Sequence, residues 1–146
     1  MNFSKSDYKY FEMARKEAKQ SDFNSFHLGC IIVYKGYVLA SGHNSNKTNP
    51  LQKKYNRKYR DFRKGSKPIV DSLHAEIASL ISIPYPIEKN VNWRDVKVYI
   101  YRISPGKRLK MGLARPCPSC MAALRDKGVR HLYYTTDDGF AKEELF

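Results

Sequence analysis

The sequence predicts a single α/β domain spanning residues 1–146, and three observations support this fold class. A chain of 146 residues is long enough to bury one core. Residues 27–41 form two apolar, β-branched runs around Lys35-Gly36, a pattern that predicts a β-hairpin. Later in the chain, the order strand, helix, strand predicts a parallel pair with a right-handed crossover, at about residues 96–103, 118–127 and 129–135.

The first part of the chain contains one more expected helix and a polar stretch. A helix is expected over residues 4 to about 20, because apolar side chains recur there at steps of three and four. Cys30, inside the hairpin, is expected to be a small buried side chain, and His27 to be structural. Residues 42–46 are polar, and either an ordinary loop or a hydrogen-bonding wall beside a site would explain them.

Residues 50–64 are expected to form an amphipathic helix within a basic insertion at about 48–66. Apolar positions recur at spacings of four, four and three, at Leu51, Tyr55, Tyr59 and Phe62. Proline at position 50 suits the first helical residue, and glycine at position 65 suits the end. Two interpretations stay open for the outer face: a solvated surface, or a phosphate-binding surface that includes Lys53, Lys54, Arg57 and Lys58.

The second half of the chain alternates helices and strands. Asp71-Ser72 is expected to cap a helix over about 73–82, which Pro84 and Pro86 end before a short loop. A basic loop is expected over residues 104–115. The acidic tail at 137–146 is expected to form one short helix.

The net charge of +13 comes from two segments. Residues 47–67 hold nine Lys or Arg and one acidic residue, and residues 102–115 hold five Lys or Arg and no acidic residue. Because the rest of the chain sums to zero, the positive charge is concentrated. Such blocks favour a phosphorylated or polyanionic partner, although charge runs are also often solvated faces.

Membrane insertion and export are not expected. The chain has no run of about 18 apolar residues, and its first residues lack the apolar core of a signal peptide. Three cysteines, an odd number, argue against a disulfide framework. We therefore expect a cytoplasmic protein with no membrane partner.

Two short motifs carry the expected chemistry, His74-Ala75-Glu76 and Pro116-Cys117-Pro118-Ser119-Cys120. Each begins an expected helix, where free amides and the helix dipole lower the pKa of a thiol. One imidazole and two thiolates suit Zn²⁺, and three protein ligands leave one coordination position for water. Glu76 is expected to take the proton of that water and to return it to a substrate nitrogen. These groups suit the hydrolytic removal of an amino group from an aromatic base.

A closed zinc site is the structural alternative to a catalytic one. In that arrangement His43, His27 or His131 would complete four ligands, and the metal would only stabilise the fold. This alternative leaves Glu76 without a role.

The two motifs together resemble the His-x-Glu and Pro-Cys-x-x-Cys signature of the cytidine and deoxycytidylate deaminase superfamily. The resemblance extends from about Gly29 to Thr135 and implies a three-layer α/β/α fold with a central mixed sheet. It implies one Zn²⁺ per chain, held by His74, Cys117 and Cys120, with Glu76 as the proton shuttle.

The resemblance also bears on the substrate. A histidine at position 74 is similar to the branches that act on phosphorylated substrates: deoxycytidylate, tRNA adenosine and polynucleotide cytidine deaminases. Asn44 is similar to an asparagine that contacts the sugar, and Ala75 is also expected at the substrate. Arg115 is an unusual neighbour of Pro116 for this family; it is expected to contact a phosphate or a base edge, with a solvent-facing side chain as the alternative. The family commonly adds a helix and a fifth strand after the strand at 129–135. Only about ten residues remain there, so the fifth strand is in question.

Three functions follow from these observations. The first is deamination of cytosine in a nucleotide such as dCMP, giving uracil and ammonia. The second is deamination of cytosine or adenine within single-stranded DNA or RNA, which the aromatic and basic residues of 50–64 and the loop cations Lys107 and Arg108 would favour. The third is a non-catalytic, zinc-stabilised nucleic-acid-binding module. Family members often assemble, so a homo-oligomer is also considered.

Overall fold

The computed structural model of the protein describes residues 2–59, 71–106 and 110–146. Its centre is a mixed sheet in the order β2-β1-β3-β5-β6, with β4 paired to the end of β3. The strands are β1 (His27–Tyr34), β2 (Tyr37–His43), β3 (Lys97–Ile103), β4 (Met111–Gly112), β5 (His131–Thr135) and β6 (Phe140–Glu144). Only β3 and β5 run parallel, as the predicted crossover requires, and the other pairs are antiparallel.

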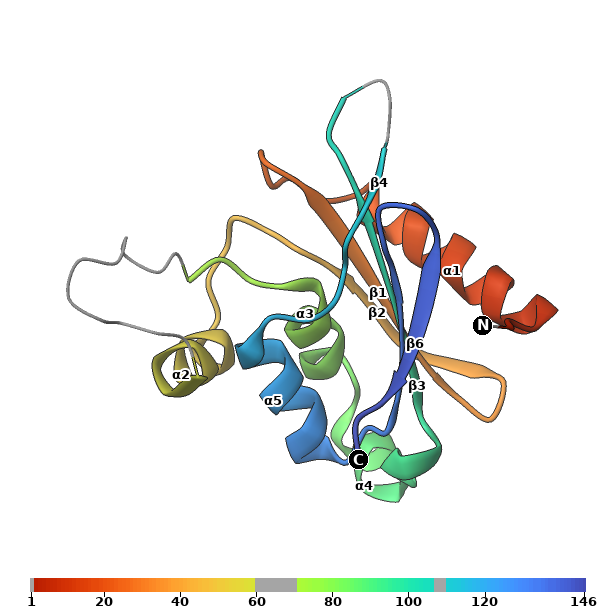
Figure 1. The fold of residues 1–146 in the computed structure, drawn as a ribbon. Coiled ribbons are helices and arrows are strands. Elements are labelled where there is room, and N and C mark those ends of the chain that lie inside the picture. The colour runs from red at the N-terminus through yellow and green to blue at the C-terminus, as the bar shows by residue number, and fades with distance from the viewer. Residues whose placement is uncertain (1, 60–70, 107–109) are drawn as a thin grey trace.

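Helices cover both faces of the sheet, which confirms the predicted three layers. Figure 1 shows α1 (Lys5–Ala18) on one face, and α3 (Ala75–Ile81) and α5 (Pro118–Lys127) on the other. The helix α2 (Pro50–Tyr59) lies outside α5. Alternate residues of each strand enter different cores: Ile31 and Tyr99 pack under α1, while Ile32 and Ile100 pack under α3 and α5. The alternation follows from the two-residue period of a strand.

The first helix and the hairpin agree with the sequence prediction. Ser4 caps α1 and forms a capping box with Asp7, which satisfies amide groups at the start of the helix. The hairpin turns at Lys35 and Gly36, both with positive φ. Cys30 is fully buried, as expected for a small apolar side chain.

The start of α3 differs from the prediction. The residue at the N-cap is His74, two or three positions later than the expected cap at Asp71-Ser72, and its side chain makes no capping hydrogen bond. The Asp71 carboxylate instead accepts a hydrogen bond from Asn56 of α2. The expected cap is therefore wrong, because Asp71 is used to hold a neighbouring helix.

The segment between α3 and β3 is more ordered than predicted. A further helix, α4 (Tyr85–Asn90), and a 3₁₀ turn (Trp93–Asp95) occupy the expected short loop. Pro84 stands at the N-cap of α4 and Pro86 in its first turn, where the missing amide of proline costs no helical hydrogen bond. The prolines therefore end α3 and also begin α4.

The C-terminal tail is a strand, so the predicted short helix is wrong. After β5 the chain turns at residues 136–139, where the Thr136 amide donates to the Gly139 carbonyl, and returns as β6, antiparallel to β5. The sheet therefore has a fifth strand on its main path. It is reached by a tight turn, with no intervening helix.

Two predicted segments lie partly outside the described residues. The helix expected at 50–64 is observed over Pro50–Tyr59, and residues 60–70 are not described. Lys107 and Arg108 of the basic loop are likewise outside the described residues.

Candidate metal and catalytic site

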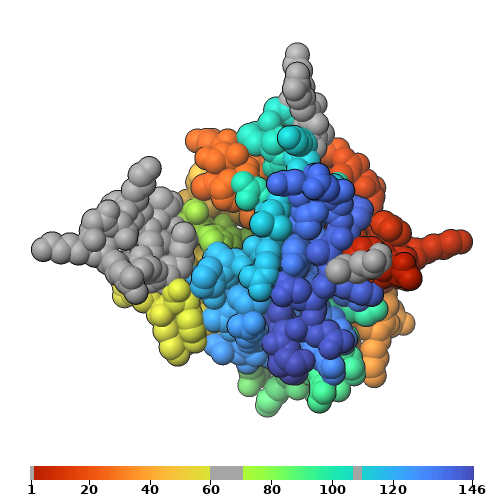
Figure 2. All heavy atoms as spheres, viewed as in Figure 1, coloured from red at the N-terminus to blue at the C-terminus, as the bar shows by residue number. Residues whose placement is uncertain are grey.

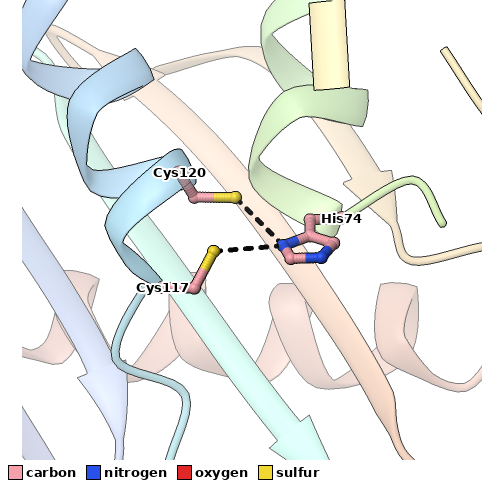
Figure 3. Close-up of side chains that lie close together, drawn as sticks. All are labelled: His74, Cys117 and Cys120. Carbon is pink, nitrogen blue, oxygen red and sulfur yellow. Dashed lines mark hydrogen bonds between the residues drawn. The ribbon is translucent and has the colours of Figure 1, made fainter. Parts of the chain in front are cut away.

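The three predicted metal ligands meet in the structure. His74 is the N-cap residue of α3, Cys117 is the N-cap residue of α5, and Cys120 lies in the first turn of α5. Figure 3 shows both sulfur atoms facing one edge of the imidazole ring. The His74 Nδ1 atom lies 3.2 Å from Cys120 Sγ and 3.5 Å from Cys117 Sγ, and all three atoms lie within 4.8 Å of one another.

These distances fit a tetrahedral zinc site. Zinc bonds of about 2.3 Å to sulfur and about 2.0 Å to nitrogen separate the two ligand atoms by about 3.5 Å at a tetrahedral angle. The observed nitrogen-to-sulfur distances are close to that value. Among the described residues, this is the only cluster of three or more His, Cys, Asp or Glu side chains with the spacing of metal ligands.

The other histidines do not join the cluster. The His43 ring bonds to the Glu17 carboxylate at 2.9 Å, and the His27 ring bonds to the Phe23 carbonyl at 2.9 Å. His131 lies at the start of β5 and lines a different surface hollow. Within the described ranges, the cluster thus has three candidate ligands and no histidine to close it as a fourth.

The two thiols have different acidities. Hydrogen bonding with Cys120 outweighs burial and, together with His74, lowers the pKa of Cys117 to about 3. Burial raises the pKa of Cys120, whose thiol also hydrogen-bonds to Cys117. Because a divalent metal deprotonates the thiols that coordinate it, both residues would ligate as thiolates.

Glu76 is buried beside these ligands. Its side chain is only 3% exposed, and Oε1 has no hydrogen-bond partner in the described part of the protein. Burial raises the pKa of this carboxyl group, partly offset by His74. A buried polar atom without a partner destabilises the folded state. Proton exchange with a bound substrate would be a physical reason for a carboxyl group at this position.

The family comparison fits this geometry. A family model for the cytidine and deoxycytidylate deaminase zinc-binding region matches residues 4–136. The chain belongs to this deaminase family. A comparison with curated proteins gave no significant match.

Solved deaminases share the fold. The apo dCMP deaminase of cyanophage S-TIM5 superposes with a TM-score of 0.56 at 19% identity, over 91% of this chain and 84% of that one. A cytidine deaminase from Burkholderia pseudomallei gives a TM-score of 0.56 at 15% identity, over 94% and 91% of the two chains. The cyanophage enzyme has also been solved with dCMP and dUMP, with a TM-score of 0.55 at 19% identity over 92% and 83% of the chains. At these identities the likeness establishes the cytidine-deaminase-like fold.

Two backbone features set the position of His74 in this member of the deaminase family. Gly42 of β2 lets α3 approach closely, because a Cβ atom there would lie 2.6 Å from the Ser79 amide nitrogen. The segment before α3 pairs with the segment after β2: the Ser45 amide donates to Leu73 O, and the Leu73 amide donates to Lys47 O. The sheet edge and the start of α3 are thereby joined on both sides of His74.

The predicted substrate residues occupy different environments. Asn44 is buried: its Oδ1 accepts from Ser21 Oγ and Leu28 N, and its Nδ2 donates to the Phe26 carbonyl. Its amide therefore braces the start of β1, and its contact with a sugar stays a prediction. Ala75 is fully buried in the first turn of α3, next to His74.

Arg115 lies on the surface immediately before Pro116. Its guanidinium donates two hydrogen bonds to the Glu143 carboxylate on β6, at 2.8 and 3.2 Å. It also lines an open hollow of about 440 Å³ together with Tyr59 and Arg125. If Arg115 bound a substrate, the substrate would share the Arg115 guanidinium with the Glu143 carboxylate.

The cations of α2 are placed as the sequence predicted. Lys53, Lys54, Arg57 and Lys58 are all exposed. Figure 2 shows α2 at the molecular surface beside α5. The basic face is therefore open to solvent on the described helix.

Two buried residues of α2 were not anticipated. Gln52 and Asn56 are both 0% exposed and hydrogen-bonded to each other. A signal was available in the sequence: they are the two uncharged polar residues among the cations of this helix, four positions apart on one face. The sequence pattern indicates an apolar stripe of Leu51, Tyr55, Tyr59 and Phe62 instead; Leu51 and Tyr55 are half-buried, Tyr59 is exposed, and Phe62 lies outside the described residues.

Proposed function

We propose that this protein is a zinc-dependent hydrolytic deaminase that acts on cytosine in a nucleotide such as dCMP, with one zinc per chain. The observation that carries the proposal is the convergence of His74, Cys117 and Cys120 beside the buried, unpartnered Oε1 of Glu76. A zinc site that only stabilised a nucleic-acid-binding module would not need this carboxyl group.

The chain's own residues divide the work. His74, Cys117 and Cys120 would hold the metal, which when bound supplies a water activated at neutral pH. Glu76 Oε1 accepts a proton from the attacking water and passes it to the base. In the net reaction a carbon–oxygen bond forms from water, the bond to the exocyclic nitrogen breaks, and ammonia leaves.

Support for a nucleotide comes from size and from the neighbours. The chain is a compact α/β unit, and the similar cyanophage enzyme is one solved with dCMP and dUMP. A substrate with one phosphate needs only one or two cations, and α2 carries four exposed ones, Lys53, Lys54, Arg57 and Lys58.

A specific observation favours a second substrate class, single-stranded nucleic acid. Aromatic rings lie beside the exposed cations of α2: Tyr55 and Tyr59 stack with their centroids 5.8 Å apart, and Lys58 lies over the Tyr59 ring. Aromatic rings among cations are typical of single-strand binding. For this second substrate class, the deaminated base would be cytosine or adenine.

The cellular setting is part of the proposal. None of the helices in the described ranges is long and apolar enough to cross a membrane. Cytoplasmic location and assembly into homo-oligomers stay predictions, the second testable by the mass of the protein in solution.

Product analysis tests the proposal directly. The zinc-loaded chain is incubated with dCMP, CMP, and single-stranded DNA and RNA, and products are identified by mass. We expect conversion of dCMP to dUMP with release of ammonia. Deamination of the oligonucleotides alone would replace the first substrate class by the second, and no deamination of any of the four would refute the activity.

A matched variant assigns the role of Glu76. Glu76→Gln keeps the shape of the side chain and removes its capacity to carry a proton. We expect full zinc content, an unchanged circular dichroism spectrum and a loss of turnover of at least about 10²-fold. Retained turnover would contradict the proton-shuttle role.

A further inference from the structure

We infer that Gln52 of α2 is a positioning residue for the metal centre, acting through the backbone of His74. This inference rests on the proposed zinc site and adds to it a residue outside both motifs. The Gln52 Oε1 atom accepts a hydrogen bond from the His74 amide at 3.0 Å. The side chain that makes this bond is fully buried.

In many helices, the amide of the N-cap residue donates its hydrogen bond to a side chain of the same helix. In a capping box, a side chain three residues into the helix accepts from the amide of the N-cap residue. The N-cap of α3 is His74, and its own imidazole faces the two sulfur atoms and makes no capping bond. The acceptor for its amide is therefore supplied by another helix, which ties the backbone of the ligand to α2.

Gln52 is itself held by a directed chain of hydrogen bonds. Gln52 Nε2 donates to Asn56 Oδ1 at 3.0 Å, and Asn56 Nδ2 donates to the Asp71 carboxylate at 2.9 Å. The two ends fix the direction, because the His74 amide can only donate and a carboxylate can only accept. Both amides are thereby locked with their oxygen atoms toward His74, and Gln52 has one orientation available.

The same helix also contacts the helix that carries the cysteines. Tyr55 of α2 donates a hydrogen bond to the Asp126 carboxylate of α5 at 2.7 Å. One helix is thus bonded to the backbone of the histidine ligand and to the helix of the thiol ligands. Its buried face positions the metal site, while its basic face stays at the surface.

Three variants of the full chain separate positioning from mere packing. Gln52→Met keeps the volume and removes the acceptor, Gln52→Glu keeps an acceptor, and Asn56→Leu breaks the network without touching the bond to His74. For each, the measurements are the ligand-field spectrum of the Co²⁺-loaded protein, the rate of zinc transfer to a chelator, and the unfolding temperature of the metal-free protein.

We expect Gln52→Met to shift the Co²⁺ spectrum and to release zinc about 10-fold faster, the scale on which outer residues tune metal sites. Gln52→Glu should restore both, because a neutral carboxyl group offers an acceptor and a donor in the places of the amide. Asn56→Leu should lower the unfolding temperature as much as Gln52→Met does but change the spectrum and zinc release less, because the His74 amide still holds the Gln52 oxygen.

The inference is overturned if Gln52→Met leaves the spectrum and zinc release unchanged, if Asn56→Leu changes them equally, or if Gln52→Glu does not restore them. Failure of the unmodified chain to bind Co²⁺ or Zn²⁺ is a different result. It would overturn the proposed metal centre, and the positioning role with it.

Discussion

At the scale of single residues, the site contains buried polar groups that destabilise the fold unless a metal ion or a substrate binds them. Glu76 is enclosed with an unpartnered oxygen, and Cys120 is enclosed as a thiol whose pKa burial raises. A metal ion would compensate the second group by binding its thiolate, and a substrate would give the first a proton partner. The proposed zinc site and proton shuttle would account for both features.

The thiol ligands give the first prediction at this scale. Cys117→Ser should leave the chain with less than one zinc per molecule, because a hydroxyl group is a much poorer zinc ligand than a thiolate. Metal content after dialysis measures this. Cys30→Ala is the matched control, since it removes a buried thiol that is outside the ligand cluster, and it should keep full zinc occupancy. Full occupancy in Cys117→Ser would mean that another group ligates.

A second residue-scale prediction concerns acid stability. Burial acts to raise the pKa of Asp7, but hydrogen bonds from Tyr99 at 2.5 Å and from Ser4 outweigh it and lower the pKa. A carboxyl group with a lowered folded pKa adds stability above its unfolded pKa of about 3.9, and this stability is lost as the pH falls through the folded value.

We therefore expect Asp7→Asn to cost about 1.5–3 kcal/mol at pH 7 and to cost less as the medium becomes acidic. Urea unfolding at a series of pH values measures the cost. Tyr99→Phe removes the other partner, so the double variant should lose less than the sum of the two single variants. A cost of Asp7→Asn that does not change down to pH 2 would contradict the assignment.

At the scale of elements, close packing of α3 on β2 sets the position of His74, the proposed histidine ligand. Gly42→Ala would place a methyl group 2.6 Å from the Ser79 nitrogen and 3.0 Å from the Ala75 oxygen, so α3 would have to move. We expect a loss of about 1–3 kcal/mol in stability and faster release of zinc. Gly139→Ala is the control, because nothing lies within 4 Å of its added methyl group. Equal behaviour of the two variants in chemical unfolding and zinc transfer would contradict this role.

Periodicity made most elements predictable from the sequence. The apolar spacing of α1 and the apolar runs of β1 and β2 each point to one structure, and the two motifs single out the three side chains that converge, His74, Cys117 and Cys120. The expected cap at Asp71-Ser72 is wrong because tertiary contacts decide the start of α3. Asp71 accepts a hydrogen bond from Asn56, and Gln52 accepts one from the His74 amide. Local rules cannot show which distant helix supplies an acceptor.

The strand β6 was missed for a related reason. Its residues Phe140–Glu144 include three charged side chains and lie at the sheet edge, so their composition does not indicate a strand. Pairing with β5 decides the structure. The Asp137-Asp138-Gly139 sequence before it is, however, a hairpin signal that could have been used.

At the scale of the whole molecule, the concentrated positive charge is expected to govern binding of polyanions. Replacing Lys53, Lys54, Arg57 and Lys58 by glutamine should weaken binding of a single-stranded oligonucleotide. It should also reduce the slope of log affinity against log salt by up to about 3, since each phosphate contact contributes about 0.7. Zinc content should not change. Fluorescence anisotropy over a salt series measures the effect.

The control removes the same number of charges on the opposite side of the sheet. Lys5, Lys9, Lys16 and Lys19 are exposed on or beside α1. Their replacement by glutamine should leave the salt slope nearly unchanged. If both quadruple variants behave alike, the basic face of α2 is a solvated surface, and the nucleotide is the better substrate class.

We propose above that the cluster of His74, Cys117 and Cys120 performs hydrolytic deamination together with Glu76. Its most direct test is turnover of dCMP by the zinc-loaded chain in water enriched in ¹⁸O, followed by mass spectrometry of the product. We expect dUMP that carries one heavy oxygen atom, formed by the unmodified protein and not by Glu76→Gln. Unlabelled product, or equal product from both proteins, would contradict it.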